Sequence, residues 1–523
     1  MIRKADERTA RTVFVMMSIM VIGKVMGLLR DRMQGVTFGG NTPEAVAFVY
    51  ASALPRNFLD IMFAAALSSS FIPVFSTYLE KKSKRGAFNL ASLFISVALV
   101  LTIVATLLAV VFAAPLYDLF VGGADLPYEY VEYTRLLGIE LLRLMFPLMI
   151  LSGLAFSFTG ILQSLGEFRL PAAMSAVSNG VILLYYFFLV DKFGVRGLAV
   201  AFLVGWALQA LIQVPWLVRH KFKFRFRLDF KDSGLREIGA LTLPVLAASW
   251  MLPVNFQVNL RAVRGLYGGM YGAPAIQFAF SLFTVVSGVF ILSVANVIFP
   301  KLSRQVATLD SEGFKVSLGE TVRALFFFLL PLTFGMMALS QPLVRLVFEG
   351  RLFCERAVEI TGTALFFMAI GILGYGLQVI LCRACFAQKD GRTPLASAIV
   401  GIGVNAVLSF TLLRLEIAGP ALAGAIGISL GSAVMVVMLT VKGYLAWPKA
   451  LVLDLAKMVA LAVLMFIIVR NINGLLTENH TLFQVLVPAA VGAVVYIGGC
   501  TLLKMSEIKW VLTHFTNKGD SIQ

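Results

Sequence analysis

The 523-residue sequence contains few charged residues. Asp, Glu, Lys and Arg make up 14% of it, where about 25% is typical of soluble domains, and hydrophobic residues make up 59%, where roughly 45–50% is typical. A soluble chain this apolar could not cover its surface with polar side chains. The composition therefore excludes a soluble enzyme, a disordered chain and a disulfide scaffold, and it predicts an all-α polytopic membrane protein.

Cysteine and histidine are also scarce, with four and three residues. Cys382 and Cys385 form a Cys-x-x-Cys pair, but it lies in an apolar run with no other Cys or His near enough in sequence to complete a metal site. The sequence contains no Gly-x-x-x-x-Gly-Lys-Ser/Thr loop and no nucleophile–His pair within an apolar run. We therefore expect no catalytic residues, no metal site and no cofactor. The energy source would be a Na+ or H+ gradient, the membrane potential or the substrate gradient.

Long apolar runs, in contrast, are abundant. Since one helical crossing needs about 20 residues, the sequence predicts about fourteen transmembrane helices. Their approximate bounds are 11–34, 44–78, 86–117, 130–164, 170–191, 195–218, 236–266, 273–303, 315–347, 356–387, 393–413, 419–442, 451–470 and 481–503. Lys and Arg gather at the N-terminus and in the loops after the second and sixth spans, whereas residues 118–129 after the third span contain neither. Because basic loops stay in the cytoplasm, we expect both termini there.

The sequence also resembles itself at a nearly constant spacing. Phe71-Ile72-Pro73 at the end of span 2 matches Ile298-Phe299-Pro300 at the end of span 8, Pro171 and Asn179 in span 5 match Pro394 and Asn405 in span 11, and Gly197-Leu198-Ala199 in span 6 resembles Pro420–Ala425 in span 12. Six helices per repeat is an even number, so the two halves share one orientation. We expect an N-terminal lobe at 1–220, a C-terminal lobe at 221–445, two extra helices at 446–523, and alternating access to a cavity between the lobes.

The loop after span 6 has an unusual pattern. From Phe222 to Arg227 it alternates Phe with Lys or Arg. The simplest interpretation is a linker between the lobes whose charge sets the orientation. A segment of this kind can also lie at an anionic membrane surface.

Charged residues inside the spans are few, and in the N-terminal half they are mostly cationic. Those of the N-terminal lobe are Lys24, Arg30 and Asp31 in span 1, Arg56 and Asp60 in span 2 with Asn57 beside them, and Arg135, Glu140 and Arg143 in span 4. The C-terminal lobe adds Arg261 and Arg264 in span 7, Arg323 in span 9 and Arg383 in span 10. Charges in a span are costly, and they usually line an aqueous path or pair with each other, as Arg56 and Asp60 can do one turn apart. The excess of cations predicts a cavity for an anion, in particular a phosphate. The alternative is snorkelling and structural ion pairing.

Four motifs carry a family resemblance. They are Gly27-Leu28-Leu29-Arg30-Asp31 followed by Phe38-Gly39, Leu54-Pro55 leading to Ser70-Phe71-Ile72-Pro73-Val74-Phe75, the segment Pro342–Phe353, and Phe386–Pro394. In this order they resemble the bacterial lipid II flippase family (MurJ, also called MviN). That family is a branch of the multidrug/oligosaccharidyl-lipid/polysaccharide exporter superfamily. The resemblance covers most of the chain.

The resemblance implies a MATE-like fold in the bacterial cytoplasmic (inner) membrane and a role in peptidoglycan biosynthesis and cell shape. The substrate would be lipid II, an undecaprenyl pyrophosphate carrying the disaccharide-pentapeptide, moved from the inner to the outer leaflet. Basic residues of the cavity would receive the head group, and the last two helices would form a groove for the lipid tail. The implied partners are lipid II, membrane lipids and cell-wall synthesis or division proteins, with no nucleic acid, and the protein would be a monomer.

The resemblance also selects site residues. Lys24, Arg30 and Asp31 match the family's first helix directly, with Lys24 in place of an Arg. The family's Arg-Arg pair of the second helix is Leu59-Asp60 here, and its helix-8 Arg falls at Ser281. The predicted substrate-binding set is therefore Lys24, Arg30, Asp31, Arg56, Asn57, Asp60, Arg261 and Arg264, the last two as substitutes. Ser409 follows Asn405 where some relatives have an Asp, which removes an acidic ligand of their sodium site.

Three other functions stay open at this point. A flippase for another polyprenyl-linked glycan would share the pyrophosphate and the tail. A cation-coupled MATE-type drug exporter would need an acidic cavity, and the cavity predicted here is basic. A scaffold that has lost transport would account for the missing family arginines.

Overall fold

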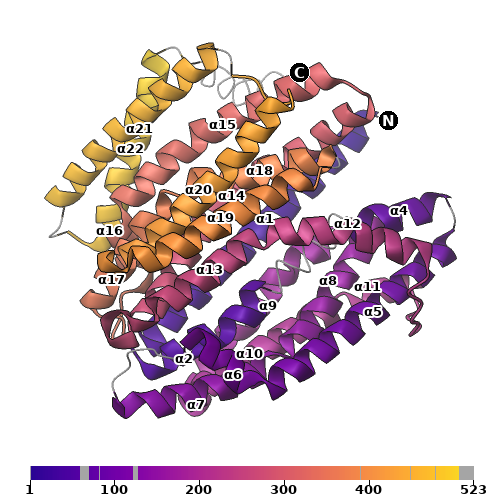
Figure 1. Cartoon of the computed structure of the whole chain (residues 1–523), viewed down its shortest axis with the longest axis horizontal. Helices are drawn as coiled ribbons and strands as arrows, with labels where there is room; N and C mark the ends of the chain where they lie inside the picture. The colour runs from indigo at the N-terminus through magenta and orange to yellow at the C-terminus, as the bar shows by residue number, and fades with distance from the viewer. Residues whose placement is uncertain are drawn as a thin grey trace. The chain divides into compact units, whose positions relative to one another are not determined.

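The computed structural model of the chain describes residues 2–58, 70–81, 83–121, 128–388, 390–447, 449–476, 479–503 and 505. This described part is helical and contains no strand (Figure 1). The chain divides into two compact units. Unit 1 comprises Met1–Pro274 with Gly350–Cys354, and unit 2 comprises Ala275–Glu349 with Glu355–Gln523. The predicted all-α class is confirmed, while the division at 220 and 445 stays a prediction.

Unit 1 is built from many short and medium helices. They are α1 (Ile2–Phe38), α2 (Pro43–Ala53), η1 (Leu54–Phe58), α4 (Ile72–Lys81), α5 (Lys84–Val111), α6 (Ala113–Val121), α7 (Tyr128–Met145), α8 (Leu148–Ser164), α9 (Arg169–Phe188), α10 (Val190–Leu211), α11 (Val214–Arg219), α12 (Ser233–Ser249), α13 (Met251–Ala262) and η3 (Val263–Gly269). Helix α1 packs on α9, α9 on α10, α10 on α8 and α8 on α5. A core of aromatic and aliphatic side chains, including the stacked rings of Phe71 and Phe75, joins α4, α5 and α8.

Unit 2 begins within α14 (Gly272–Ala307), whose first three residues belong to unit 1. It continues with α15 (Ser311–Ala338), α16 (Ser340–Phe348), α17 (Glu355–Ala369), α18 (Ile372–Ala387), α19 (Arg392–Thr411), η4 (Leu413–Leu415), α20 (Ala418–Val441), α21 (Lys449–Leu475) and α22 (Thr481–Leu502). Helix α20 packs on α17, α18 and α19, while α21 packs on α15 and α22. Met458, Met465 and Tyr496 lie in the core that attaches α21 and α22 to α15.

Local sequence signals explain several helix starts. The Thr42 hydroxyl accepts a hydrogen bond from the Ala45 amide at 3.2 Å, and Pro43 occupies the first helical position of α2. Ser83 caps α5 in the same way, through the Gly86 amide at 3.0 Å. These caps satisfy amides that have no partner within their own helix.

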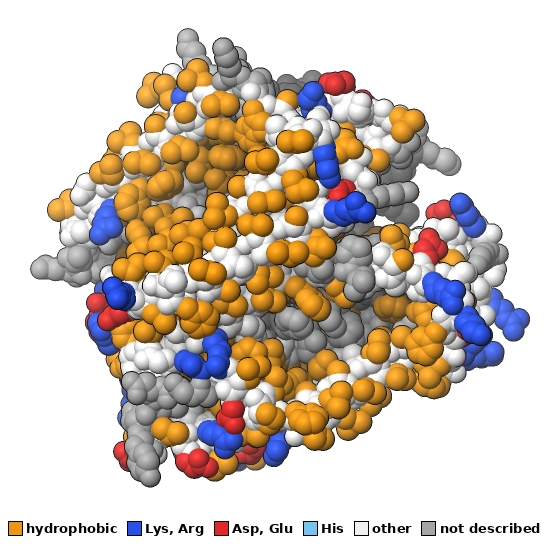
Figure 2. Space-filling view, in the orientation of Figure 1, with side chains coloured by type: hydrophobic (Ala, Val, Ile, Leu, Met, Phe, Trp, Pro, Cys, Tyr) orange, Lys and Arg blue, Asp and Glu red, His pale blue; other side chains and the backbone are white. Residues whose placement is uncertain are grey.

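The helices have the length and apolarity of membrane spans. Within the described residues, nine helical stretches qualify, and ten if the pair α17 and α18, bent by 47°, is one span. Helix α1 carries Lys24, Arg30, Asp31 and Arg32 in its crossing stretch and is less apolar, and the second predicted span includes residues 59–69, which lie outside the described part. Figure 2 shows hydrophobic side chains over most of the face in view. The chain is an integral membrane protein, while the count of fourteen spans stays a prediction.

Close helix contacts recur at the repeat spacing. A Cβ on Gly205 of α10 would approach the Ser178 carbonyl oxygen of α9 to 3.1 Å, and a Cβ on Gly427 of α20 would approach the Gly401 carbonyl oxygen of α19 to 2.6 Å. The two glycines therefore allow equivalent helix pairs to pack tightly in the two units. This agrees with the internal repeat predicted for spans 5 and 6 and spans 11 and 12.

Candidate functional site

A polar pocket lies inside unit 1, among α1, η1, α8, α9 and α10. Its volume is about 470 Å³, which is within the roughly 300–1,000 Å³ of small-ligand sites. Its lining combines two arginines, several hydroxyl and amide groups, and aromatic rings: Arg30, Arg56, Phe156, Thr159, Gln163, Pro171, Met174, Ser175, Ser178, Asn179, Ile182, Phe202, Trp206 and Gln209. Two of the eight predicted site residues, Arg30 and Arg56, thus share one cavity.

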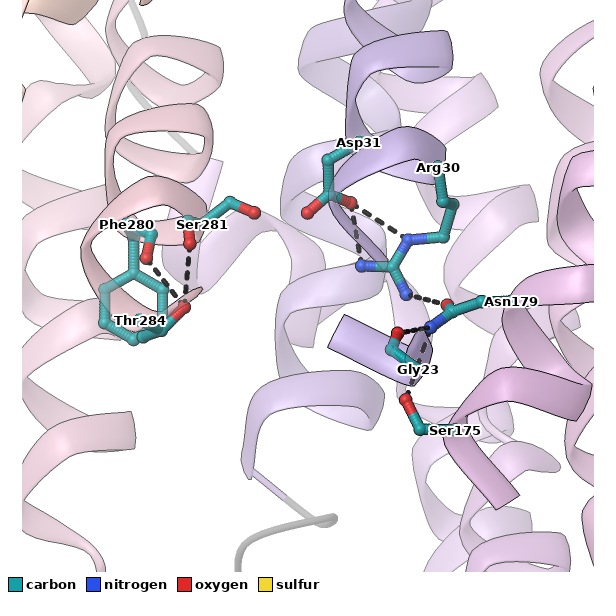
Figure 3. Close-up of polar contacts among 8 residues, drawn as sticks. All are labelled: Gly23, Arg30, Asp31, Ser175, Asn179, Phe280, Ser281 and Thr284. Carbon is teal, nitrogen blue, oxygen red and sulfur yellow. Dashed lines mark hydrogen bonds and ion pairs between the residues drawn. The ribbon is translucent and has the colours of Figure 1, made fainter. Parts of the chain in front are cut away.

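Arg30 is held in place by partners on two helices (Figure 3). Its Nε and Nη2 donate to Asp31 Oδ1 at 2.9 and 2.7 Å, and its Nη1 donates to Asn179 Oδ1 at 2.9 Å. Asn179 Nδ2 in turn donates to the Gly23 carbonyl oxygen at 3.1 Å and to Ser175 Oγ at 3.3 Å. Asn179 on α9 therefore fixes the Arg30 guanidinium and fastens α1 to α9.

Arg56 reaches the pocket from an irregular turn. Pro55 follows α2, and residues Leu54–Phe58 form a single π-helical turn, a feature often found at functional sites. The Arg56 guanidinium carbon lies 4.4 Å from the centroid of the Phe202 ring, and that of Arg30 lies 5.6 Å from the same centroid. The Phe202 ring therefore supports two guanidinium groups by cation–π attraction.

The charges of the pocket favour an anion. Arg30 is balanced by Asp31, which is 5% exposed, so this pair adds no net formal charge. Arg56 is the second cation among the lining residues, which include no Asp or Glu. Two fixed guanidinium groups in a low-dielectric site bind planar or tetrahedral oxyanions through several short hydrogen bonds at once.

The other six predicted residues are not among the lining residues of this pocket, and three of them are Lys24, Asn57 and Asp60. Lys24 lies on an exposed face of α1 and is not among the lining residues. The side chain of Asn57 and the whole of Asp60 lie outside the described part of the chain, and so does the proposed Arg56–Asp60 pair. The roles of these residues stay predictions.

Arg261 and Arg264 form a second cationic group, at the junction of α13 and η3. Both are half-buried, and the Tyr50 hydroxyl from α2 donates to the carbonyl oxygen of Leu260 at 3.1 Å beside them. Arg261 Nη1 and Gln257 Nε2, one turn apart on α13, are buried and have no hydrogen-bond partner within the described residues. These donors are available to an acceptor, but they do not line the pocket of Arg30 and Arg56.

Other charges in the spans form ion pairs. Arg135 Nε and Nη2 donate to the two carboxylate oxygens of Asp118 at 2.8 and 2.7 Å. Glu140 accepts from Nε and Nη2 of Arg196 at 2.8 and 2.9 Å. Arg135 and Glu140 of span 4 therefore belong to structural ion pairs, as the alternative interpretation expects. The cations that line the pocket are Arg30 and Arg56.

The repeat-related helix of unit 2 has a neutral polar centre. Ser409 Oγ on α19 donates to Asn405 Oδ1 at 3.0 Å, and both residues are fully buried. No group of three or more His, Cys, Asp or Glu residues suited to a metal ion occurs among the described residues. Ser281, where the family's helix-8 Arg was expected, lies on α14, and its carbonyl oxygen accepts a hydrogen bond from Thr284 at 3.0 Å (Figure 3).

Several pocket residues were missed from the sequence. In the sequence, Asn179 marks only the repeat, and Phe202, Trp206, Gln163 and Gln209 belong to no predicted site. They carry no charge, so the cost of placing a charge in an apolar span does not distinguish them. The usable signal was the presence of amide side chains in apolar spans, where each must find a hydrogen-bond partner.

Two kinds of solved structure share this fold. The chain superposes on a lipid II flippase MurJ in an inward closed conformation with a TM-score of 0.78 at 22% identity, covering 94% of this chain and 99% of that one. An inward-facing MATE family multidrug resistance transporter gives a TM-score of 0.65 at 18% identity, covering 82% and 97%. The predicted MATE-like fold is confirmed.

Sequence comparison distinguishes between these two kinds of transporter. A "Probable lipid II flippase MurJ" of Thermotoga maritima is 28% identical over 503 residues, covering 94% of this chain and 95% of that protein, and one of Treponema pallidum is 26% identical over 409 residues, covering 77% and 76%. The family model described as "Lipid II flippase MurJ" matches residues 36–489. The chain therefore belongs to the lipid II flippase MurJ family.

Proposed function

We propose that this protein moves lipid II from the inner to the outer leaflet of the bacterial cytoplasmic membrane and binds its pyrophosphate in the unit 1 pocket. Family membership supports the substrate class. The main structural support for this site is that the guanidinium groups of Arg30 and Arg56 both lie over the Phe202 ring. They do so in a cavity that is also lined by hydroxyl and amide groups.

The pocket is sized for one end of the substrate. A volume of about 470 Å³ suits a pyrophosphate with the adjoining sugar. It is too small for the disaccharide and the pentapeptide together, which need space beyond this cavity. Trp206 and the amides of Gln163 and Gln209 lie where they can contact the sugar next to the phosphates.

The second cationic group suits the remote part of the head group. Arg261, Arg264 and the unpartnered amide of Gln257 can donate to carboxylates of the pentapeptide. A substrate with anions at both ends would then contact α1, η1 and α13 at once. Lys24, Asn57 and Asp60 belong to the same proposed binding set.

The proposed work is transport with no chemical reaction, by alternating access, with both termini in the cytoplasm. The energy comes from an ion gradient, the membrane potential or the substrate gradient. A net positive pocket that reorients across the membrane would be coupled to the potential by about 2.3 kcal/mol per charge per 100 mV.

The direct test is translocation in proteoliposomes. Fluorescent lipid II placed in one leaflet should appear in the other at a protein-dependent rate, and an unglycosylated polyprenyl phosphate should compete weakly. The same assay with a polyprenyl-linked glycan that lacks the peptide separates lipid II from other substrates of this type. Equal rates with and without the protein would contradict the proposal.

A further inference from the structure

The segment between α11 and α12 is extended and exposed. Residues Phe222–Phe230, here called the linker segment, have no helical or strand structure. Phe222 is buried and packs edge-to-face on Phe88 of α5, with ring centroids 5.4 Å apart. From Phe224 onward the apolar side chains are open to the surroundings, with Phe226 60% and Phe230 64% exposed. The transport function described above uses none of these residues.

Two backbone hydrogen bonds fix the linker segment along α5. The Arg225 amide donates to Ser92 Oγ at 3.4 Å and the Arg227 amide to Ser96 Oγ at 3.0 Å. Two residues of extended chain advance by about 6.6 Å, and four residues of helix by about 6 Å. These two advances are nearly equal, so the segment runs parallel to the α5 axis in a defined register.

This register separates two rows of side chains. Successive side chains of an extended segment point to opposite sides. Phe224, Phe226 and Leu228 therefore form an apolar row, and Lys223, Arg225 and Arg227 form a basic row, all exposed. Between residues 219 and 231 there are six Lys or Arg and one acidic residue, Asp229. The neighbouring ends of α4 and α5 add Lys81, Lys84 and Arg85 against Glu80.

The length of α5 places these rows at the membrane boundary. Its 28 residues span about 42 Å, whereas the hydrocarbon layer is about 30 Å thick. Val111 and Phe112 at the far end are exposed and apolar, so the excess length lies at the Lys84 end and amounts to about eight residues. Ser92 is then close to the level at which α5 enters the hydrocarbon layer. Figure 2 shows Lys and Arg side chains gathered at the end of unit 1 where Figure 1 labels α4, α5 and α11.

We propose that the linker segment is a binding site for anionic phospholipids. The rings of Phe224 and Phe226 insert at the headgroup boundary, while Lys223, Arg225 and Arg227 bind headgroup phosphates. Trp216, stacked under the Arg219 guanidinium at 4.8 Å, extends the same surface. The occupant is membrane phospholipid, because the rows lie at the boundary of the layer and the pocket for the substrate pyrophosphate is elsewhere in unit 1.

The test measures the depth of the segment in lipid nanodiscs holding the full chain. A spin label is attached to Phe226→Cys in a Cys354→Ser background, because Cys354 is exposed and the other three cysteines are buried or half-buried. With phosphatidylglycerol in the disc, we expect accessibility to oxygen to exceed accessibility to a nickel chelate several-fold. With phosphatidylcholine alone, or at high salt, that ratio should fall. A label exposed to water in both discs, or a depth independent of lipid charge, would overturn the proposal.

A second test of phospholipid binding uses a charge variant of the linker segment with a matched control. Lys223→Gln/Arg225→Gln/Arg227→Gln should lower phosphatidylglycerol retention in native mass spectrometry several-fold. Lys192→Gln/Arg356→Gln/Arg414→Gln, which removes three exposed cations elsewhere, should leave it unchanged. Equal losses in both variants, or insertion of the label driven by added lipid II in place of phosphatidylglycerol, would also overturn the proposal. Failure of translocation with intact lipid binding would count against the transport function alone.

Discussion

Helices α9 and α19 are related by the internal repeat, yet their buried asparagines have different surroundings. Asn179 on α9 holds the Arg30 guanidinium and fastens α1. Asn405 on α19 accepts a hydrogen bond from a neutral serine hydroxyl. Each helix packs against a glycine of its neighbour, Gly205 or Gly427. The two halves thus keep the same packing, while the asparagine of α9 orients an arginine of the proposed anion site and the asparagine of α19 binds a serine hydroxyl.

The ion pairs show the same difference. In unit 1, Arg30 lies in a pocket with its carboxylate partner buried beside it. In unit 2, Arg323 of α15 pairs with Asp454 of α21, and Lys457 lies 3.3 Å from the same carboxylate. That group joins two helices and serves packing. The comparison predicts that removing charge from unit 1 reduces substrate binding and that removing charge from unit 2 reduces stability.

The largest effect is expected for Arg30→Gln. It removes a charged hydrogen-bond donor worth about 1.5–3 kcal/mol, so lipid II affinity should fall about 10- to 100-fold. The variant also leaves Asp31 buried without its charge partner, which costs about 3–5 kcal/mol of stability. The double variant Arg30→Gln/Asp31→Asn should recover the melting temperature in detergent but not the affinity. The matched unit 2 variant Arg323→Gln should lower the melting temperature and leave lipid II affinity within about twofold, and an affinity loss there would remove the contrast.

The next effect is expected for Arg56→Gln. Loss of one guanidinium contact of about 1.4 kcal/mol corresponds to a tenfold rise in Kd. Arg56→Lys should recover part of the affinity because it keeps the charge but loses the planar fork. Arg383→Gln, a half-buried cation of α18 in unit 2, is the control and should bind normally. Full translocation activity of Arg56→Gln would remove Arg56 from the proposed site.

A smaller difference is expected between the two asparagines. Asn179→Ala removes the acceptor that orients Arg30, and about 1 kcal/mol for that hydrogen bond corresponds to a fivefold loss of affinity. Asn405→Ala should lower stability by about 0.5–1.5 kcal/mol, because it removes the hydrogen bond that Ser409 donates to Asn405, and it should leave affinity unchanged. Lipid II titration and thermal unfolding of both variants test this, and equal affinity losses would mean that the repeat halves bind substrate alike.

The smallest effect concerns a loop of unit 2. Burial alone would raise the pKa of Asp390, but hydrogen bonds from Lys442 and Thr393 outweigh it and hold the pKa below its ordinary value. This carboxylate also caps α19 through the Thr393 amide at 3.2 Å. A lowered folded-state pKa stabilises the protein above about pH 4, and that contribution, about 0.5–1 kcal/mol for a partly exposed pair, is lost as the pH falls through the folded-state value. Asp390→Asn should therefore lower the melting temperature at pH 7 and lower it less near pH 3.5, with no change in lipid II affinity at pH 7.

Much of the fold could be predicted from the sequence. The helices are predicted by apolar runs of membrane length and by the positions of Pro and Gly. The pairing of spans 5 and 6 is indicated by the repeat. The exact bends could not be predicted, because the π-turn at Leu54–Phe58 and the break between α17 and α18 depend on packing against other helices.

The site could be predicted only in part. Arg30 and Arg56 stood out because a charge in an apolar span is costly and therefore rare. Asn179 and Phe202 act by orienting those charges, and neutral residues in an apolar run leave no comparable signal. Conversely, Arg135 looked like a cavity residue in sequence, but Asp118, 17 residues earlier, neutralises it.

A structure of the chain with lipid II bound would test the proposed site most directly. We expect the diphosphate within about 3 Å of the guanidinium nitrogens of both Arg30 and Arg56, above the Phe202 ring. A diphosphate bound by residues of unit 2, with the pocket of Arg30 and Arg56 filled only by water, would contradict it.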